Sequence, residues 1–275
     1  MLWIAGKAVH GTRMKTTTAH QMVPGTGLQL SPRGGFRKGP FAATGQAGLQ
    51  ADACRGLLES LRDTGTPTVD RRHEPGDLIC GEGDYGGALY LVLDGVTKLS
   101  VIRSEASEAI LRLAGPWEVI GVPVPGWKPS RLTWVEAFTA CEVVKVPRMF
   151  VERAVRENPN VALKLTELLE LELARREELF GCLLPRTTEA RLARLLPILA
   201  RQFGVARDGG WIIELRLTHY DLAEMVASTR ESVTAAVNSF RRRGVLEKKA
   251  GIIFILEPEE LAQTAAPWAR PVRLN

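Results

Sequence analysis

Residues 218–233 read THYDLAEMVASTRESV, and this stretch decides the fold of the C-terminal third of the chain. It predicts two short helices joined by a tight turn. Thr218 can cap the first helix, with Asp221 completing a variant of the capping box. Ser228 or Thr229 can cap the second helix. Apolar residues recur at helical spacing in both segments, so each helix has one face to bury.

The opposite face of the second helix is polar. It carries side chains that can hydrogen-bond to base edges, namely Arg230, Glu231, Thr234 and Asn238. This layout is typical of a helix-turn-helix, whose second helix enters the DNA major groove with its N-terminal part. The alternative is an ordinary packed helical hairpin that binds no nucleic acid.

The residues that follow favour DNA binding. Arg241, Arg242 and Arg243 end the helix, where cations suit the helix dipole and reach phosphates. Gly244 can close the helix, and residues 245–247 and 252–256 predict two strands around a turn at 248–251. A recognition helix followed by a basic hairpin is a winged helix. The candidate phosphate contacts are Thr218, Ser228, Arg241, Arg242, Arg243, Lys248 and Lys249.

Length and composition indicate a soluble protein of about two domains. The chain has 275 residues, of which 45% are hydrophobic and 24% are charged. No apolar run reaches the roughly 18 residues of a membrane span, and the first residues lack the pattern of a signal peptide. We therefore expect the chain to reside in the cytoplasm.

The net charge of +5 is unevenly distributed along the chain. Residues 1–51 carry six basic and no acidic residues, residues 52–184 carry 16 basic and 21 acidic residues, and residues 185–275 carry 14 basic and 10 acidic residues. An acidic middle beside a basic C-terminal domain suits a sensor joined to a nucleic-acid reader.

Residues 1–51 have no sustained periodicity and are expected to be a disordered basic tail. The alternatives are an arm that touches DNA and a translation start placed too early. Four cysteines, Cys54, Cys80, Cys141 and Cys182, lie far apart in sequence. This spacing favours buried free thiols over a zinc or iron–sulfur site, although spatial convergence and a redox role stay open.

Between the tail and the winged helix, the pattern predicts a sensor-like domain over 52–150 and a long helix. After a short helix at 51–61, many short strands with Gly and Pro turns indicate a jelly roll or barrel. One helix is expected over 157–184, and an amphipathic helix over 186–203 opens the C-terminal domain of residues 185–275. The segment 151–184 is assigned to dimerisation, because near-heptad apolar spacing suits a dimer seam; packing on its own domain is the alternative. The seam residues would be Val161, Leu165, Leu169, Leu173, Leu179 and Leu183.

This order of parts resembles the CRP/FNR family of bacterial transcription regulators over residues 52–262. In the roll the resemblance depends on residues 75–77, 83–84 and 91–99. In the DNA domain it depends on residues 229–233, which read TRESV and are similar to the family's recognition motif S/T-R-E-T/S-V. Residues 157–159, 201–205 and 228–230 are similar to the NtcA-like nitrogen regulators. The implied fold is α+β: a cyclic-nucleotide-binding-like β-roll (jelly roll), a long dimerisation helix and a C-terminal winged helix-turn-helix.

The resemblance also implies where an effector would bind. The family's cyclic-nucleotide pocket has a carboxylate for the ribose, but the corresponding segment reads Ile120-Gly121-Val122. The missing hydrogen bond would cost about 1.5–3 kcal/mol, which argues against cyclic AMP as the effector. Arg131 stands where NtcA-like proteins bind 2-oxoglutarate, so a related metabolite stays open, but Glu172 replaces a second arginine of that site.

Further along the long helix, Arg175, Arg176 and Glu177 could line a different pocket. An ion pair between Arg131 and Glu177 is the alternative to a ligand role. The effector candidates are therefore Ile120, Gly121, Val122, Arg131, Arg176 and Glu177.

The resulting expectation is a homodimeric, sequence-specific DNA-binding transcription regulator, acting on a pseudo-palindrome. Arg230 would donate to guanine and Glu231 would accept from cytosine, whereas Ala235 replaces a further base-reading arginine of the family. RNA polymerase is an implied partner, and activation an implied role. The rival hypothesis is a ligand-sensing or scaffold protein whose winged helix binds protein. No motif indicates an enzyme, a cofactor or a metal site.

Overall fold

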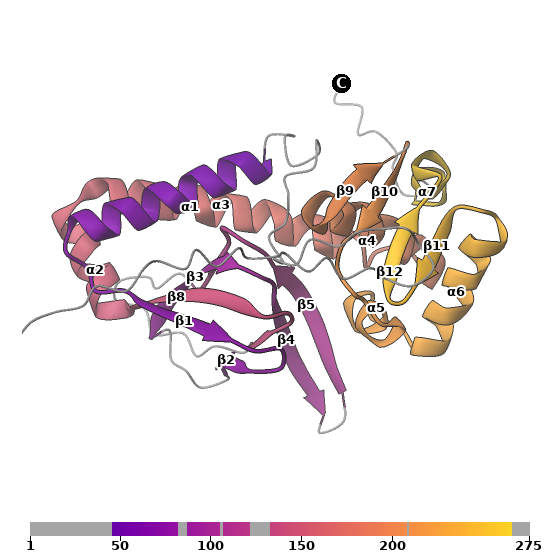
Figure 1. Ribbon diagram of the computed structural model, residues 1–275, viewed down its shortest axis with the longest axis horizontal. Coiled ribbons are helices and arrows are strands. Elements are labelled where there is room, and N and C mark those ends of the chain that lie inside the picture. Colours follow the sequence, from indigo (N-terminus) through magenta and orange to yellow (C-terminus); the bar gives the residue numbers. More distant parts are fainter. Residues whose placement is uncertain (1–45, 82–86, 105–106, 122–132, 208, 266–275) are drawn as a thin grey trace, which may run out of the picture. The chain divides into compact units, whose positions relative to one another are not determined.

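The computed structural model describes residues 46–81, 87–104, 107–121, 133–207 and 209–265 (Figure 1). Most of the expected basic tail, residues 1–45, therefore lies outside the described residues. The described elements form a β-roll with three helices, followed by a domain of helices around a small sheet.

The roll consists of two antiparallel four-stranded sheets, which confirms the predicted jelly-roll-like architecture. One sheet has the order β1 (Val69–His73), β8 (Cys141–Pro147), β3 (Ala88–Asp94) and β6 (Val119–Ile120). The other has the order β2 (Leu78–Cys80), β7 (Trp134–Ala137), β4 (Thr97–Ser104) and β5 (Ser107–Ala114). β3 and β8 are almost continuously apolar, because one side of their sheet packs on the opposite sheet and the other on helices.

The turn between β3 and β4 requires glycine. Gly95 has a φ of 77°, and a Cβ placed there would lie 2.1 Å from the carbonyl oxygen of Ala140. Only a residue without a side chain fits this position, as the Asp94-Gly95 turn signal predicts.

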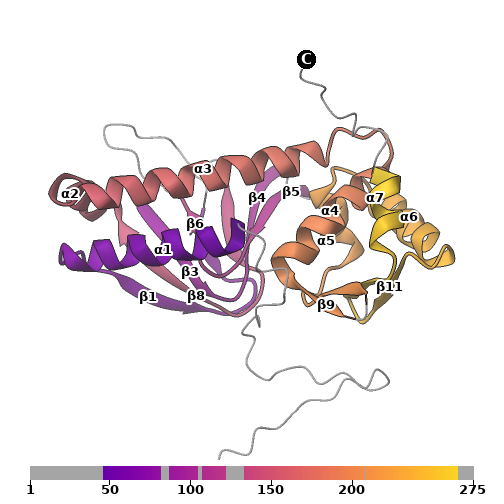
Figure 2. The same cartoon turned by 90° about the horizontal axis from the view of Figure 1, so that it is seen from above.

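Helices α1 (Gln46–Asp63) and α3 (Pro159–Gly181) lie side by side over the roll (Figures 1 and 2). Helix α1 starts before the expected residue 51, so the predicted boundary of the tail is wrong by at least five residues. The physical reason is that Gln50 and Ala53 are buried, and that Leu57 packs in the same cluster as Val161 and Leu165 of α3.

The long helix expected over 157–184 is present as α3, and a separate helix, α2 (Arg148–Glu157), precedes it. Asn158 is extended between them, and its side chain accepts a hydrogen bond from the Asn160 amide at 3.0 Å. Pro159 occupies the first turn, where its missing N–H costs nothing. Residues 151–157, assigned to the long helix, therefore belong to a separate element.

The C-terminal domain comprises four helices and four strands among its described residues. The helices are α4 (Thr188–Phe203), α5 (His219–Met225), α6 (Arg230–Arg242) and α7 (Pro258–Ala265). The strands are β9 (Gly204–Arg207), β10 (Gly210–Ile213), β11 (Leu246–Lys249) and β12 (Ile252–Ile255), in the sheet order β11-β12-β10-β9. Strands β9 and β10 were not among the elements expected from the sequence.

One apolar cluster joins this domain to the roll. Val96, Ile110 and Leu113 of the roll belong to the same buried cluster as Leu199 and Phe203 of α4. A Cβ on Gly115 would lie 3.0 Å from the Phe203 ring, so the turn after β5 passes close to α4.

All four cysteines are buried thiols, as predicted. Burial raises the pKa of Cys54 to about 12 and the pKa values of Cys141 and Cys182 to about 11. These thiols are therefore protonated and weakly nucleophilic at neutral pH. In the part of the chain that the structure describes, no helix is long and apolar enough to cross a bilayer.

Candidate nucleic-acid interface

The first helix of the pair, α5, begins with the predicted capping box. The Thr218 hydroxyl accepts a hydrogen bond from the Asp221 amide at 3.0 Å, and the Asp221 carboxylate accepts one from the Thr218 amide at 2.7 Å. Two of the orphan donors at the helix start are thereby satisfied locally. The caps are encoded within four residues, which is why the sequence predicts this boundary.

The turn between α5 and α6 is held by an arginine that sequence reasoning missed. The Arg191 guanidinium, on α4, donates to the carbonyl oxygens of Val226 and Ala227 at 3.0 Å each. It also donates to the carbonyl oxygen of Pro185 at 2.8 Å, in the segment after α3. Ala227 has a φ of 49°, a left-handed conformation that residues other than glycine rarely adopt. The hydrogen bonds from Arg191 therefore stabilise this turn.

Thr229 is the residue that caps α6, since its hydroxyl accepts from the Ser232 amide at 3.2 Å. Ser228, the other candidate, instead shares a hydrogen bond with Thr188 at 2.7 Å. Val233, Val237 and Phe240 are buried, as the amphipathic pattern predicts. Arg230, Glu231 and Asn238 lie on the other face, with Arg230 and Glu231 exposed in the first turn.

Thr234 differs from the other predicted base contacts because its hydroxyl is already bonded. It donates to the carbonyl oxygen of Arg230 at 2.8 Å and lies 2.8 Å from Nδ1 of His219. A hydroxyl has one proton, so Nδ1 of His219 must be the donor in the second bond. Burial lowers the pKa of His219, and the cations of Lys248 and Arg230 lower it further. His219 thus links the start of α5 to α6 through this hydrogen bond, and its ring is neutral at neutral pH.

The three arginines at the C-terminal end of α6 differ in their contacts. Arg241 and Arg242 are exposed. Arg243 is ion-paired with Glu189 at 2.6 Å and stacks over the Phe240 ring at 5.1 Å. Gly244, with a φ of 74°, ends the helix in the left-handed conformation, which fits its predicted capping role.

The wing is the hairpin of β11 and β12. β11 continues through Lys249, so the turn consists of Ala250 and Gly251, with φ values of 50° and 84°. Two positive φ values are characteristic of the two-residue hairpin turns that suit strand twist. Burial lowers the pKa of Lys248, opposed by Asp221, while Lys249 is exposed and lies 2.8 Å from Glu247.

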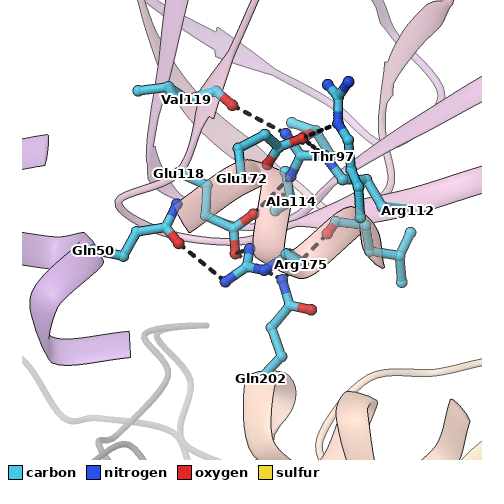
Figure 3. Close-up of polar contacts among 11 residues, drawn as sticks. Gln50, Thr97, Arg112, Ala114, Glu118, Val119, Glu172, Arg175 and Gln202 are labelled. Atoms are coloured by element: carbon cyan, nitrogen blue, oxygen red, sulfur yellow. Dashed lines mark hydrogen bonds and ion pairs between the residues drawn. The ribbon is translucent and has the colours of Figure 1, made fainter. Parts of the chain in front are cut away.

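A second polar assembly, which we call the junction network, lies where the roll, α3 and α4 meet (Figure 3). It comprises Arg112 on β5, Glu118 before β6, Glu172 and Arg175 on α3, and Gln202 on α4. Arg112 donates to Glu118 at 2.8 Å and to the Val119 carbonyl at 3.0 Å, and its Nε lies 3.0 Å from Glu172.

The Glu118 carboxylate is the centre of this network. One oxygen accepts from Arg112, and the other pairs with Arg175 and accepts from Nε2 of Gln202 at 2.7 Å. Burial alone would lower the pKa of Arg175, but Glu118, Glu172 and Glu178 outweigh it and raise this pKa above its usual value. The arginine cations are thus held by carboxylates of the same chain.

Comparison with known proteins identifies the family to which the two domains are similar. A family model for the Crp-like helix-turn-helix domain matches residues 190–264, and one for the cyclic nucleotide-binding domain matches residues 70–158. A global nitrogen regulator of Synechocystis sp. is 30% identical over 199 residues, covering 72% of this chain and 88% of that protein. The regulatory protein CysR of Synechococcus elongatus is 31% identical, covering 71% and 91%.

The chain belongs to the CRP/FNR family of DNA-binding transcription regulators. The family resemblance inferred from the sequence is thereby confirmed. The fold agrees: the structure of FixK2 from Bradyrhizobium japonicum covers 72% of this chain and 97% of that chain, with a TM-score of 0.63 and 23% identity.

Several of the CRP/FNR effector candidates are not brought together. Ile120 is buried in the roll core, and Gly121 has a φ of 67°. Arg176 extends the junction network at its exposed rim by donating to Glu172 at 2.8 Å, whereas Glu177 is exposed. Val122 and Arg131 lie outside the described residues, so the suggested Arg131–Glu177 pair stays a prediction.

Sequence reasoning did not single out Glu118, Arg112 and Gln202, which the structure joins in the junction network. The only available signal was a charged pair six residues apart in an otherwise apolar stretch, at 112 and 118. Glu172, which the sequence suggested would repel a dicarboxylate, instead pairs with Arg112.

The predicted seam of α3 is partly wrong. Val161 and Leu165 are buried in the cluster that joins α3 to the roll, together with Leu168. Leu169 and Leu173 are 43% and 58% exposed, and Phe180 is 63% exposed. Leu179 is half-buried against the C-terminal cluster, and Leu183 lies beyond the end of α3. Helix α3 is apolar on two faces, and periodicity alone did not separate them.

Proposed function

We propose that this protein is a homodimeric regulator that reads a pseudo-palindromic DNA site with helix α6. The observation that carries the proposal is the exposed pair Arg230 and Glu231 in the first turn of a capped helix, between a helix-turn-helix turn and a basic wing. A side chain in this turn reaches base edges when the helix enters the major groove. Since its target would be chromosomal DNA, the protein would act in the cytoplasm.

Arg230 and Glu231 would supply sequence readout. The guanidinium fork of Arg230 matches O6 and N7 of guanine, and Glu231 can accept a hydrogen bond from N4 of cytosine. Asn238 is a second-rank contact. The hydroxyl of Thr234 already donates to the Arg230 carbonyl, so its contribution would come through its methyl group or through positioning.

Phosphate affinity would come from cations and amide donors around α6. Arg241 and Arg242 are exposed and can neutralise phosphates. Thr218, Ser228, Lys248 and Lys249 border the same helix pair, whereas Arg243 would first have to leave Glu189.

Regulators of this family bind double-stranded DNA and act as dimers. In this chain the dimer contact would be the stripe of Leu169, Leu173 and Phe180, which is exposed although apolar. These residues lie four and seven positions apart, so they share one face of α3. Pairing of two such faces would place two recognition helices about one DNA turn apart.

An effector other than cyclic AMP, and contact with RNA polymerase, complete the proposal. One relative, from Mycobacterium tuberculosis, is named a CRP-like cAMP-activated global transcriptional regulator and is 25% identical over 221 residues. This chain has Ile120-Gly121-Val122 in place of the ribose-binding carboxylate segment. Activation by cyclic AMP would therefore not transfer from that relative.

The proposal is tested by selecting duplexes from random DNA with the purified full-length chain. We expect enrichment of an inverted repeat whose half-sites are centred about 10 base pairs apart. The affinity for the enriched duplex should fall steeply with salt. Recovery of duplexes without a common sequence, at an affinity equal to that for random DNA, would contradict sequence-specific readout.

A further inference from the structure

The buried members of the junction network carry an even balance of charge, and the exposed Arg176 pairs with Glu172 at the rim. The side chains of Arg112 and Glu118 are only 4% and 5% exposed, and those of Glu172 and Arg175 are 10% and 19% exposed. Two guanidinium cations therefore face two carboxylates. Removing one partner of such a buried pair leaves a charge that water cannot solvate, which is strongly unfavourable.

Glu118 is the member that reaches three parts of the chain. It bonds to Arg112 of its own sheet region, to Arg175 of α3 and to Gln202 of α4. Gln202 also donates to the carbonyl oxygen of Leu113 at 3.2 Å, next to Arg112. Arg175 in turn donates to Gln50 of α1 at 3.1 Å. A single carboxylate thus connects the roll and α3 to the first helix of the DNA-binding domain (Figure 3).

A dissociable anion would find these cations already neutralised. To bind Arg112 and Arg175, a free carboxylate would have to displace Glu118 and Glu172 and leave them buried and unpaired. The geometry therefore opposes a carboxylate effector at this junction and does not require one.

We propose that Glu118 acts as a built-in carboxylate ligand, which positions the DNA-binding domain through Gln202 without a dissociable anion. The proposal rests on the DNA-binding function proposed above. It specifies which contacts hold the roll and the DNA-binding domain in the arrangement that binds DNA. In the arrangement that the network stabilises, Arg230 and Glu231 are exposed. Loss of the network should therefore weaken DNA binding.

The test removes the Glu118 carboxylate by mutation and supplies acetate in its place. Glu118→Ala removes the atoms that acetate contains, and leaves Arg112 and Arg175 beside the vacated space. DNA affinity is measured with the duplex that the wild-type chain selects from random DNA. We expect Glu118→Ala to bind this duplex at least about fivefold more weakly, the lower end of typical coupling between sites. Acetate should restore most of the loss, whereas chloride at equal ionic strength and neutral acetamide should not.

Two further variants separate positioning from general damage. Gln202→Met leaves the four charged residues in place but cuts the bond to α4, so it should weaken DNA binding without rescue by acetate. Glu152→Ala is the matched control, because Glu152 pairs with Arg148 at 2.6 Å in the same half of the chain, away from α4. It should leave DNA affinity unchanged. Thermal unfolding of every variant verifies folding, and Gln202→Met keeps the proposal testable if Glu118→Ala does not fold.

The outcomes distinguish this inference from the function on which it rests. If the wild-type chain selects no sequence, the proposed function fails. If the wild-type chain selects a site, and Gln202→Met binds it as tightly as the wild type does, the inference fails. An increase in affinity on removing Glu118 would mean that the network holds a DNA-incompetent arrangement, which also overturns it. A rise in wild-type affinity on adding succinate or 2-oxoglutarate would show that a free dicarboxylate is used after all.

Discussion

At the scale of single residues, the proposed DNA readout by α6 depends on which side chains face outward and which are held by the protein. Arg230 is exposed in the first turn, Arg242 is exposed in the last, and Arg243 is paired with Glu189. In the proposed complex the first turn would reach base edges, whereas the last turn lies beside the wing. Position along the helix therefore predicts different roles for chemically identical side chains.

We predict that Arg230→Ala costs about 1–3 kcal/mol of binding free energy on the selected duplex and much less on random DNA, because random DNA offers no fixed guanine. Arg242→Ala should weaken binding to all sequences about equally and reduce the salt slope by roughly one per contact. Titrations of both duplexes at several salt concentrations measure the two effects. Equal losses on both duplexes for Arg230→Ala would make it a phosphate contact only.

His219 provides a prediction on pH. Its folded-state pKa lies below the usual value of about 6.5, so the unfolded chain binds a proton more readily than the folded chain does. Stability should therefore be lost as the pH falls from about 7 through the interval between the two pKa values. His219→Gln removes this titration, and urea unfolding between about pH 5 and about pH 7.5 should show a shallower pH dependence than in the wild type. An identical pH dependence in both proteins would exclude His219 as the titrating group.

At the scale of elements, prediction from sequence succeeded where the signals are local. The caps Thr218 and Thr229 and the terminating Gly244 lie within a few residues of the boundaries they set. The Asp94-Gly95 turn is similarly local. Strands β9 and β10 were missed, because each has only four residues and too little alternation to stand out.

The junction network could not be predicted for the opposite reason. Its members and their partner Gln50 span residues 50 to 202, and only the packing of α1, α3 and α4 around the turn after β5 brings them together. Helix α3 illustrates the same limit. Its apolar residues face both the roll and the surface, so the sequence predicted a seam but assigned Val161 and Leu165 to the wrong face.

The exposed stripe of α3 gives a prediction for assembly. Leu173→Glu should dissociate the dimer, since a charge would be buried at its centre. Sedimentation velocity at micromolar concentration measures the change. Met149→Glu is the control, because Met149 is 67% exposed but lies on α2. A Leu173→Glu variant that sediments as the wild-type dimer would rule out this face as the seam.

At the scale of the whole molecule, the roll matches the cyclic nucleotide-binding domain, and the family resemblance implies that Ile120-Gly121-Val122 replaces the segment whose carboxylate would hold the ribose. Calorimetry with cyclic AMP at about millimolar concentration should therefore show no specific binding, and DNA affinity should not change. The missing charge-assisted hydrogen bond is worth about 1.5–3 kcal/mol. Micromolar binding of cyclic AMP would contradict this interpretation of residues 120–122.

The central claim is that two copies of the chain read two half-sites with their α6 helices. Hydroxyl-radical footprinting of the selected duplex, with the stoichiometry measured by sedimentation, tests it most directly. We predict two chains per duplex and two protected regions on one face of the DNA, centred about 10 base pairs apart. One chain bound to a single protected half-site, or protection that does not follow the sequence, would contradict the claim.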